Sequence, residues 1–204
     1  MKEPEEMRSI NHEISSTCCK VIVLIFFILT ASFPSLTPGY CDENTPSMDF
    51  LLSAPADDRH KQYLGLSSDK DFSPGEIKAR VVIIEIYSMY CPYCQHGAPD
   101  VNALYNLIQS RPTLKDKIKL IGIGAGNTIF EVNFFREKYN VEFPLFSDTD
   151  FSIHKKVGQV RTPHFFGLLI KGKGQIEIFY SKTGEFSSPE IFLQTILSES
   201  GIKE

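Results

Sequence analysis

What the sequence lacks excludes several classes of protein. Its 204 residues carry a net charge of −4 and contain no block of basic residues, so a nucleic-acid partner is not expected. The five cysteines are too few and too unevenly spaced for a disulfide framework. Because only Cys91 and Cys94 have CxxC spacing, no second pair exists to complete a four-cysteine zinc site, and we expect no metal.

A hydrophobic run of full transmembrane length is also missing. Val21–Leu29 is continuously apolar, Lys20 precedes it, and residues 21–40 carry no charge. A basic residue before an apolar run of this length is typical of a signal peptide, and the run is shorter than the roughly 20 residues of a membrane span. We therefore expect residues 1–40 to export the protein to the periplasm or another extracytoplasmic compartment and to be cleaved. A retained membrane tether is the alternative.

The rest of the chain has the pattern of an α/β domain behind a polar extension. Residues 41–75 are rich in turn formers, and we expect them to lie over the core of a domain formed by 76–204. Apolar periodicity predicts strands at 81–87, 118–123, 165–170 and 176–180, helices at 94–110, 131–139 and 187–198, and a turn with a short helix at 148–157. This order predicts a central mixed β-sheet flanked by helices on both faces, with an insertion before the third strand. Ser187 and Glu190 have the spacing of a capping box at the start of the last helix.

Cys91 and Cys94 lie where the first predicted strand leads into a helix. The unpaired N–H groups and the positive dipole end of a helix N-terminus stabilise a thiolate, which is the nucleophilic form of cysteine. Cys94, one turn further along, can attack a mixed disulfide made by Cys91 and release the product. A structural disulfide is the alternative, but closing so short a loop removes little unfolded-state entropy. We predict a redox-active pair that needs no other cofactor.

An acidic residue, Glu85, interrupts the apolar strand six residues before Cys91. Burying a carboxylate raises its pKa, and such a group near the cysteines can accept the proton that Cys94 must lose before it attacks. The alternative is a Glu that points to a sheet edge or to a lysine partner.

Pro163 and His164 stand directly before a strand expected to pair beside the cysteines. Since proline cannot donate to a strand ladder, a cis bond is one way to place Pro163 there, and an ordinary trans turn is the other. We expect His164 to face the cysteines, where it either tunes the Cys91 thiolate or lies at the surface. Cys91, Cys94 and His164 would also form a soft ligand set for Cu(I), so a copper-binding protein is the alternative function.

The motif Cys91–Cys94, of sequence Cys-Pro-Tyr-Cys, resembles the active sites of the thioredoxin superfamily. Glu85 matches the buried acid that thioredoxins and protein disulfide isomerases carry six residues before the first cysteine. Pro99 matches their helix-kinking proline, and Thr162–Pro163 matches their cis-proline pair. The resemblance spans Val81–Leu197 and implies a thioredoxin fold.

Residues 121–123, 134–139 and 143–148 resemble the TlpA and alkyl-hydroperoxide-reductase branch of that superfamily, whose TlpA-like members are commonly exported and tethered. The resemblance implies a thiol–disulfide oxidoreductase that acts on thiols and disulfides of exported proteins, with a membrane electron donor or acceptor as partner. Its catalytic residues would be Cys91, Cys94 and Glu85, and its substrate contacts would be Thr162, Pro163, Tyr90, Pro92 and Tyr93.

Three positions depart from related families. Ile84 and Ser88 stand where the peroxidatic motif of peroxiredoxins has Pro and Thr, so peroxidase activity is not expected. Tyr90 stands where thioredoxin has its active-site Trp, and the chain contains no Trp. The copper-delivery proteins of this fold use CxxxC spacing, which counts against the copper alternative. Whether the protein reduces or oxidises its substrates is left open.

Overall fold

The computed structural model describes residues 45–203. The expected signal peptide or tether at 1–40 therefore lies outside the described residues, and it stays a prediction together with the domain boundaries. Within the described part of the chain, no helix is both long enough and apolar enough to cross a membrane.

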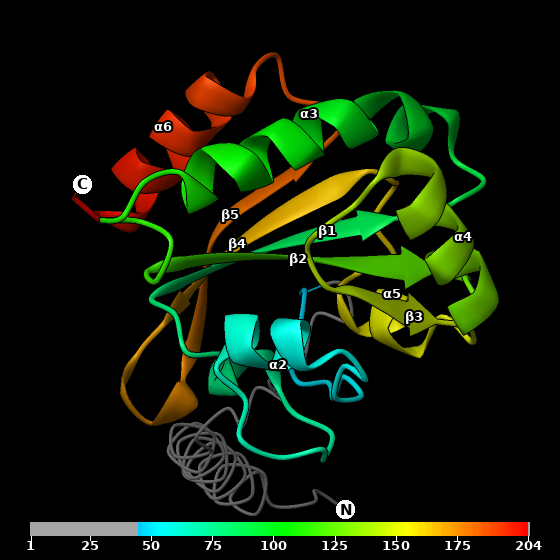
Figure 1. Ribbon diagram of the computed structural model, residues 1–204, viewed down its shortest axis with the longest axis horizontal. Coiled ribbons are helices and arrows are strands. Elements are labelled where there is room, and N and C mark those ends of the chain that lie inside the picture. The colour runs from blue at the N-terminus through cyan, green and yellow to red at the C-terminus, as the bar shows by residue number, and fades with distance from the viewer. Residues whose placement is uncertain (1–44, 204) are drawn as a thin grey trace, which may run out of the picture. The chain divides into compact units, whose positions relative to one another are not determined.

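A five-stranded mixed sheet forms the centre of the fold (Figure 1). Its order is β3 (Leu145–Asp148), β2 (Ile118–Ala125), β1 (Val81–Tyr87), β4 (His164–Ile170) and β5 (Ile176–Thr183). The β1–β2 and β2–β3 pairs are parallel, whereas β1–β4 and β4–β5 are antiparallel. Every residue of β1 is buried, as expected for an almost continuous apolar run with both faces covered.

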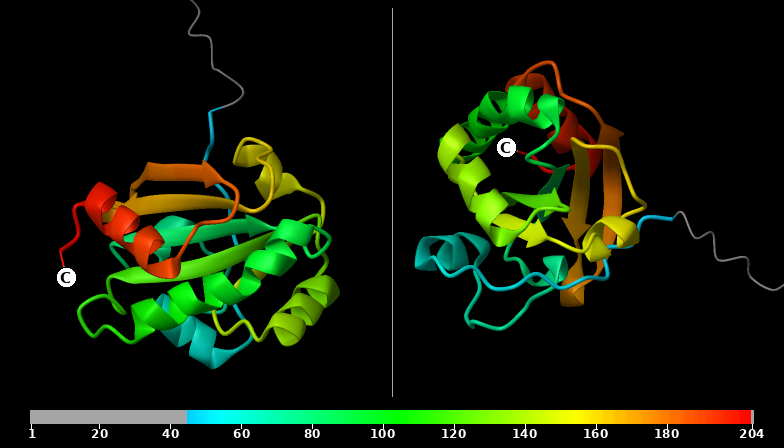
Figure 2. Two further views of the ribbon diagram at one scale, coloured as in Figure 1. Left: turned by 90° about the horizontal axis from the view of Figure 1, so that it is seen from above. Right: turned by 90° about the vertical axis from the view of Figure 1, so that its right-hand side faces the viewer.

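Helices cover both faces of this sheet, as predicted (Figures 1 and 2). The helices α3 (Pro92–Gln109), α4 (Ile129–Tyr139) and α6 (Pro189–Ser200) pack with Val81, Ile83 and Tyr87 in one core, which we call the cysteine-side core because it contains Cys94. The opposite core contains Val82, Ile84 and Ile86 and is covered by α5 (Ser152–Lys156) and by the N-terminal extension, which includes α2 (Asp58–Leu64). Short 3₁₀ turns occur at Pro74–Glu76 and Gly172–Gly174.

The N-terminal extension lies over the opposite core, as expected. Met48, Phe50 and Leu52 are buried there, and Leu52 forms an antiparallel bridge with Phe72. The residues of the extension before α2 thus add to the apolar cover that α2 and α5 provide.

Two local expectations were wrong. No strand was expected at β3, because a four-residue edge strand is too short to show periodicity. Its last residue, Asp148, is buried and accepts hydrogen bonds from the backbone N–H groups of Ile153 and His154. The residue that caps α6 is Ser188 and not Ser187: its side chain accepts from the Ile191 N–H at 3.1 Å.

The expectation that His164 faces the cysteines was also wrong, because this residue lies on the opposite face of the sheet. It pairs with Ile86 of the opposite core, whereas its neighbour Phe165 pairs with Glu85 on the cysteine side. It is not at the surface either, being only 5% exposed. Its Nδ1 and Nε2 lie 2.7 Å from the Thr183 hydroxyl and 3.0 Å from the Ser181 hydroxyl. His164 therefore joins β4 to β5, and burial lowers its pKa to about 4.

The cap of α6 can be tested by a matched pair of substitutions. We expect Ser188→Ala to lower the free energy of unfolding by about 1 kcal/mol, because it leaves a first-turn N–H without its acceptor. Ser187→Ala removes the same hydroxyl one residue earlier and should change it little. Chemical denaturation of both variants measures the difference, and an equal loss in both would contradict the observed cap.

The buried His164 predicts a pH dependence of stability. Its folded pKa of about 4 lies below the ordinary 6.5, so the native state binds fewer protons than the unfolded chain between these values. The contribution of neutral, buried His164 to the free energy of unfolding is fully present above pH 6.5. As the pH falls towards 4, this contribution is lost, by roughly 2 kcal/mol. Denaturation at pH 7 and pH 4.5 should show this loss in the wild type and a smaller loss in His164→Gln. Equal losses in the two proteins would contradict the placement.

Candidate active site

Cys91 stands at the junction of a buried strand and a long helix. The chain leaves β1 at Tyr87, and Cys91 is the N-cap residue of α3, with Pro92 in the first turn. Pro fits this position because its missing N–H would have no partner in a helix anyway. The Cys91 sulfur consequently lies at the positive end of the α3 dipole, as the sequence predicted.

The surroundings of Cys91 favour its ionised form. Partial burial acts against ionisation and is the largest single influence on this thiol. Hydrogen bonds from the Thr162 side chain and from the N–H groups of Cys94 and Tyr93 together outweigh it, so the pKa of Cys91 lies below its ordinary value. When protonated, the thiol donates to the Thr162 carbonyl oxygen at 3.2 Å.

Cys94 has the opposite character. It belongs to the first turn of α3 but is only 1% exposed, within the cysteine-side core. Burial raises its pKa strongly, and the negative charges of Glu85 and Cys91 add to the rise against a hydrogen bond from the Ser88 backbone. The two free thiols thus differ as an attacking and a resolving cysteine must differ.

Glu85 lies in the middle of β1 on the cysteine side of the sheet and is 4% exposed. Desolvation raises its pKa to about 8, and the negative charge of Cys91 adds to the rise. The alternatives of a sheet edge or a lysine partner are therefore wrong. At neutral pH this carboxyl can both take up and give up a proton, as acid–base work requires.

Thr162 and Pro163 complete the surroundings of the sulfur. The peptide bond between them is cis, as one of the two sequence expectations had it. Pro163 is buried next to β4, whereas Thr162 is partly exposed and touches Cys91 through its carbonyl. Pro99 lies inside α3, also as predicted.

The three remaining predicted contact residues surround the cysteines at the surface. Tyr90 and Tyr93 are 66% and 65% exposed, which is unusual for large side chains, and Pro92 is exposed between them. The Tyr90 hydroxyl donates to Glu131 at the start of α4. These side chains are free to touch a substrate chain that approaches Cys91.

A narrow crevice connects Glu85 with the surface. Its volume is about 10 Å³, which is the least that holds one water molecule. It is lined by Glu85, Tyr93, Gly97, Asp100, Val101, Pro163, Phe165, Glu185 and Phe186. The crevice thus brings Glu85 together with residues of α3 and of the loop that follows β5.

Two contributors to this site were not identified from the sequence. Asn127 is fully buried, and its Oδ1 accepts from the Met89 N–H at 2.8 Å, which fixes the loop before Cys91. Glu185 reaches the crevice from the far end of β5. Asn127 could have been suspected as a polar residue just after a buried strand, but no sequence signal marks Glu185.

The copper alternative loses its third ligand in this arrangement, because His164 lies across the sheet from the cysteines. Among residues 45–203, no group of three or more His, Cys, Asp or Glu side chains is placed to hold a metal ion.

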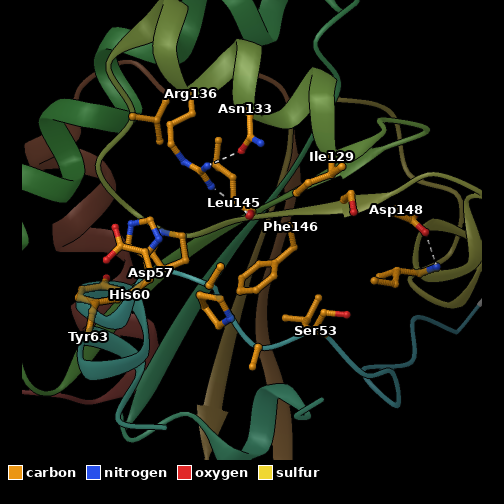
Figure 3. A pocket seen from close by; sticks show the side chains of 18 of the residues that line it. Ser53, Asp57, His60, Tyr63, Ile129, Asn133, Arg136, Leu145, Phe146 and Asp148 are labelled. Atoms are coloured by element: carbon orange, nitrogen blue, oxygen red, sulfur yellow. Dashed lines mark hydrogen bonds between the residues drawn. The ribbon is translucent and has the colours of Figure 1, made fainter. Parts of the chain in front are cut away.

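A much wider pocket than this crevice lies elsewhere, along the free edge of β3 (Figure 3). It encloses about 990 Å³ between residues 51–57 of the extension, α2 and α4. Arg136 reaches Asn133 and the Leu145 carbonyl on its upper wall (Figure 3). Neither cysteine lines it, and neither does Glu85 or Pro163, so it is separate from the candidate active site.

Solved structures with this fold include several disulfide oxidoreductases. A secreted Mycobacterium tuberculosis disulfide oxidoreductase homologous to E. coli DsbE is 15% identical with a TM-score of 0.52, covering 74% of this chain and 96% of its own. StoA from Bacillus subtilis is 21% identical with a TM-score of 0.52, covering 74% and 97%. A putative thiol:disulfide interchange protein DsbE from Chlorobium tepidum is 17% identical with a TM-score of 0.55, covering 78% and 99%. At these identities the likeness establishes the thioredoxin fold.

The sequence itself carries the family assignment. No curated protein matches the chain. The sequence profile of the AhpC/TSA family, however, matches residues 54–179, which is well over half of the chain and includes both cysteines, Glu85 and Pro163. Together with the thioredoxin fold, this match shows that the chain belongs to the AhpC/TSA family.

Proposed function

We propose that this protein is a thiol–disulfide oxidoreductase that works through a Cys91–Cys94 dithiol. The observation that carries the proposal is the pairing of an accessible, acidic thiol at a helix N-terminus with a buried, weakly acidic thiol above Glu85. A structural pair of cysteines needs no such difference, whereas two-step disulfide exchange depends on it.

The exchange runs in two balanced steps. The Cys91 thiolate attacks one sulfur of a substrate disulfide, forms a mixed disulfide and displaces the other substrate sulfur as a thiolate. The Cys94 thiol then passes its proton to the Glu85 carboxylate, and its sulfur attacks Cys91. The Cys91–Cys94 bond forms, the second substrate thiolate leaves, and two electrons have moved to the substrate. Oxidation of a substrate dithiol follows the same steps in reverse.

Thr162 and Pro163 are the proposed docking surface for the substrate chain. The Thr162 carbonyl already contacts Cys91, so an extended segment beside it would present its own sulfur to the nucleophile. Tyr90, Pro92 and Tyr93 would contact side chains of that segment from the other side of Cys91. These contacts recognise a polypeptide backbone rather than one small molecule, and they need no cofactor besides the Cys91–Cys94 disulfide.

Exported proteins are the proposed substrates. The support is the apolar run Val21–Leu29 after Lys20 and a structural relative that is described as secreted. Disulfides persist outside the reducing cytoplasm. A thiol–disulfide donor or acceptor in the membrane would restore the pair after each turnover, and the N-terminal segment would be removed or kept as a tether.

Trapping the mixed disulfide tests the proposal. We expect Cys94→Ser to accumulate a covalent adduct when the full chain is mixed with a disulfide-containing model protein, because the resolving thiol is absent. Mass spectrometry should locate the adduct at Cys91, and dithiothreitol should release it. The matched variant Cys91→Ser should form no adduct at Cys94, since that thiol is buried. An absence of adduct at Cys91, or equal trapping by both variants, would contradict the function.

A further inference from the structure

Because Glu85 is buried, its proton needs a route to and from solvent. Each time the Cys91–Cys94 disulfide closes, Glu85 gains one proton, and each time it opens, Glu85 must give one back. The carboxyl is almost completely buried, so these protons must cross the crevice to reach solvent. The crevice is therefore the place to look for a second acid–base group.

Glu185 stands at the outer end of this crevice. It is one of the lining residues, its side chain is 32% exposed, and it comes from the loop after β5. A Cβ atom added at Gly97 would lie 3.5 Å from Oε1 of Glu185. The carboxylate thus packs directly against α3 at a position where the helix has no side chain, one turn after Cys94.

His96 holds Glu185 there. Its Nδ1 lies 2.6 Å from Oε1 of Glu185, joining α3 to the loop across the crevice. The imidazole is 82% exposed, so one side of the pair is in contact with solvent while Glu185 lines the path to Glu85. An isolated surface ion pair contributes little to stability, and this one is placed instead where protons must pass.

We propose that Glu185, positioned by His96, carries protons between Glu85 and solvent during disulfide exchange. The inference rests on the proposed redox function and extends it to a second acid–base residue. On closing of the disulfide, Glu85 gives its proton to a water in the crevice while that water gives one to the Glu185 carboxylate. Glu185 then releases the proton to solvent, directly or through His96. The Glu85 carboxylate left behind takes up the Cys94 proton as that sulfur attacks Cys91, so no charge is left in the interior.

Other ionisable groups face the same crevice. Tyr93 and Asp100 of α3 line it beside Glu85 and Glu185. Cys91 and Cys94 do not line it, but their charges interact with Glu85. Asp100 is the competing carboxylate, and it acts on His96 as a further negative charge. Glu185 is the stronger candidate because it is fixed by His96 and by close packing against Gly97.

The experiment measures how fast the disulfide closes and opens in the full chain. Reduced protein is mixed with oxidised glutathione, and oxidised protein with dithiothreitol, between pH 6 and pH 9 in dilute buffer. Acid quenching and alkylation then report the state of Cys91 and Cys94 by mass spectrometry. The variants are Glu185→Gln, Glu85→Gln, their combination and Asp100→Asn, with Glu190→Gln as an exposed control in the next helix.

We expect Glu185→Gln to slow both formation and reduction of the Cys91–Cys94 disulfide roughly tenfold. This is a smaller effect than the loss of an acid–base group that acts directly on the reacting sulfur. Imidazole added to the buffer should restore the rate, because a small base can replace the lost carboxylate, and no structural defect would be rescued in this way. The combined variant should be no slower than Glu85→Gln alone, since the two residues act in series. Glu190→Gln should behave as the wild type.

Three outcomes would overturn the inference: a wild-type rate in Glu185→Gln, a slow rate that imidazole does not restore, or slowing by Asp100→Asn in place of Glu185→Gln. Each of these leaves the redox function intact, because the disulfide still forms. Failure of the wild type to form the Cys91–Cys94 disulfide would instead refute the proposed function itself.

Discussion

The junction between β1 and α3 is the constraint on which the site depends. A strand buried on both faces ends at Tyr87, and four residues later Cys91 caps an 18-residue helix. The first-turn N–H groups have no intrahelical acceptor, and those of Tyr93 and Cys94 point to the Cys91 sulfur. The same turn carries Cys94 into the core, so a single local structure produces one exposed and one buried thiol.

The buried Glu85 follows from the same strand. Alternation along β1 sends Val81, Ile83 and Tyr87 into the cysteine-side core and sends Glu85 beneath Cys94 with them. An unpaired carboxylate in such a place costs several kcal/mol, and the protein reduces that cost by keeping Glu85 protonated up to about pH 8. A carboxyl that can lose its proton near neutral pH can then accept the proton of the resolving thiol, provided that a path to solvent exists.

Much of the fold and part of the site could be predicted from local patterns. Apolar periodicity located four strands and the long helices, and CxxC after a buried strand located the cysteines. His164 was misjudged because both faces of β4 are buried, so its apolar pattern cannot reveal which face each residue joins. That depends on pairing with β1, where Phe165 meets Glu85 and His164 meets Ile86. Glu185 was not identified for a similar reason. It packs against Gly97, which lies 88 residues earlier in the sequence, and no local sequence pattern predicts a contact between residues so far apart.

The reduction potential of the Cys91–Cys94 pair tests the central claim most directly. The full chain is equilibrated in glutathione buffers of graded ratio, and alkylation with mass spectrometry identifies which cysteines are linked. We predict one two-electron transition in which Cys91 and Cys94 are joined to each other, with a midpoint that places the protein as a reductase or an oxidase. If Cys91 and Cys94 stay reduced at every ratio, or form only mixed disulfides with glutathione, the redox function proposed for this site is wrong.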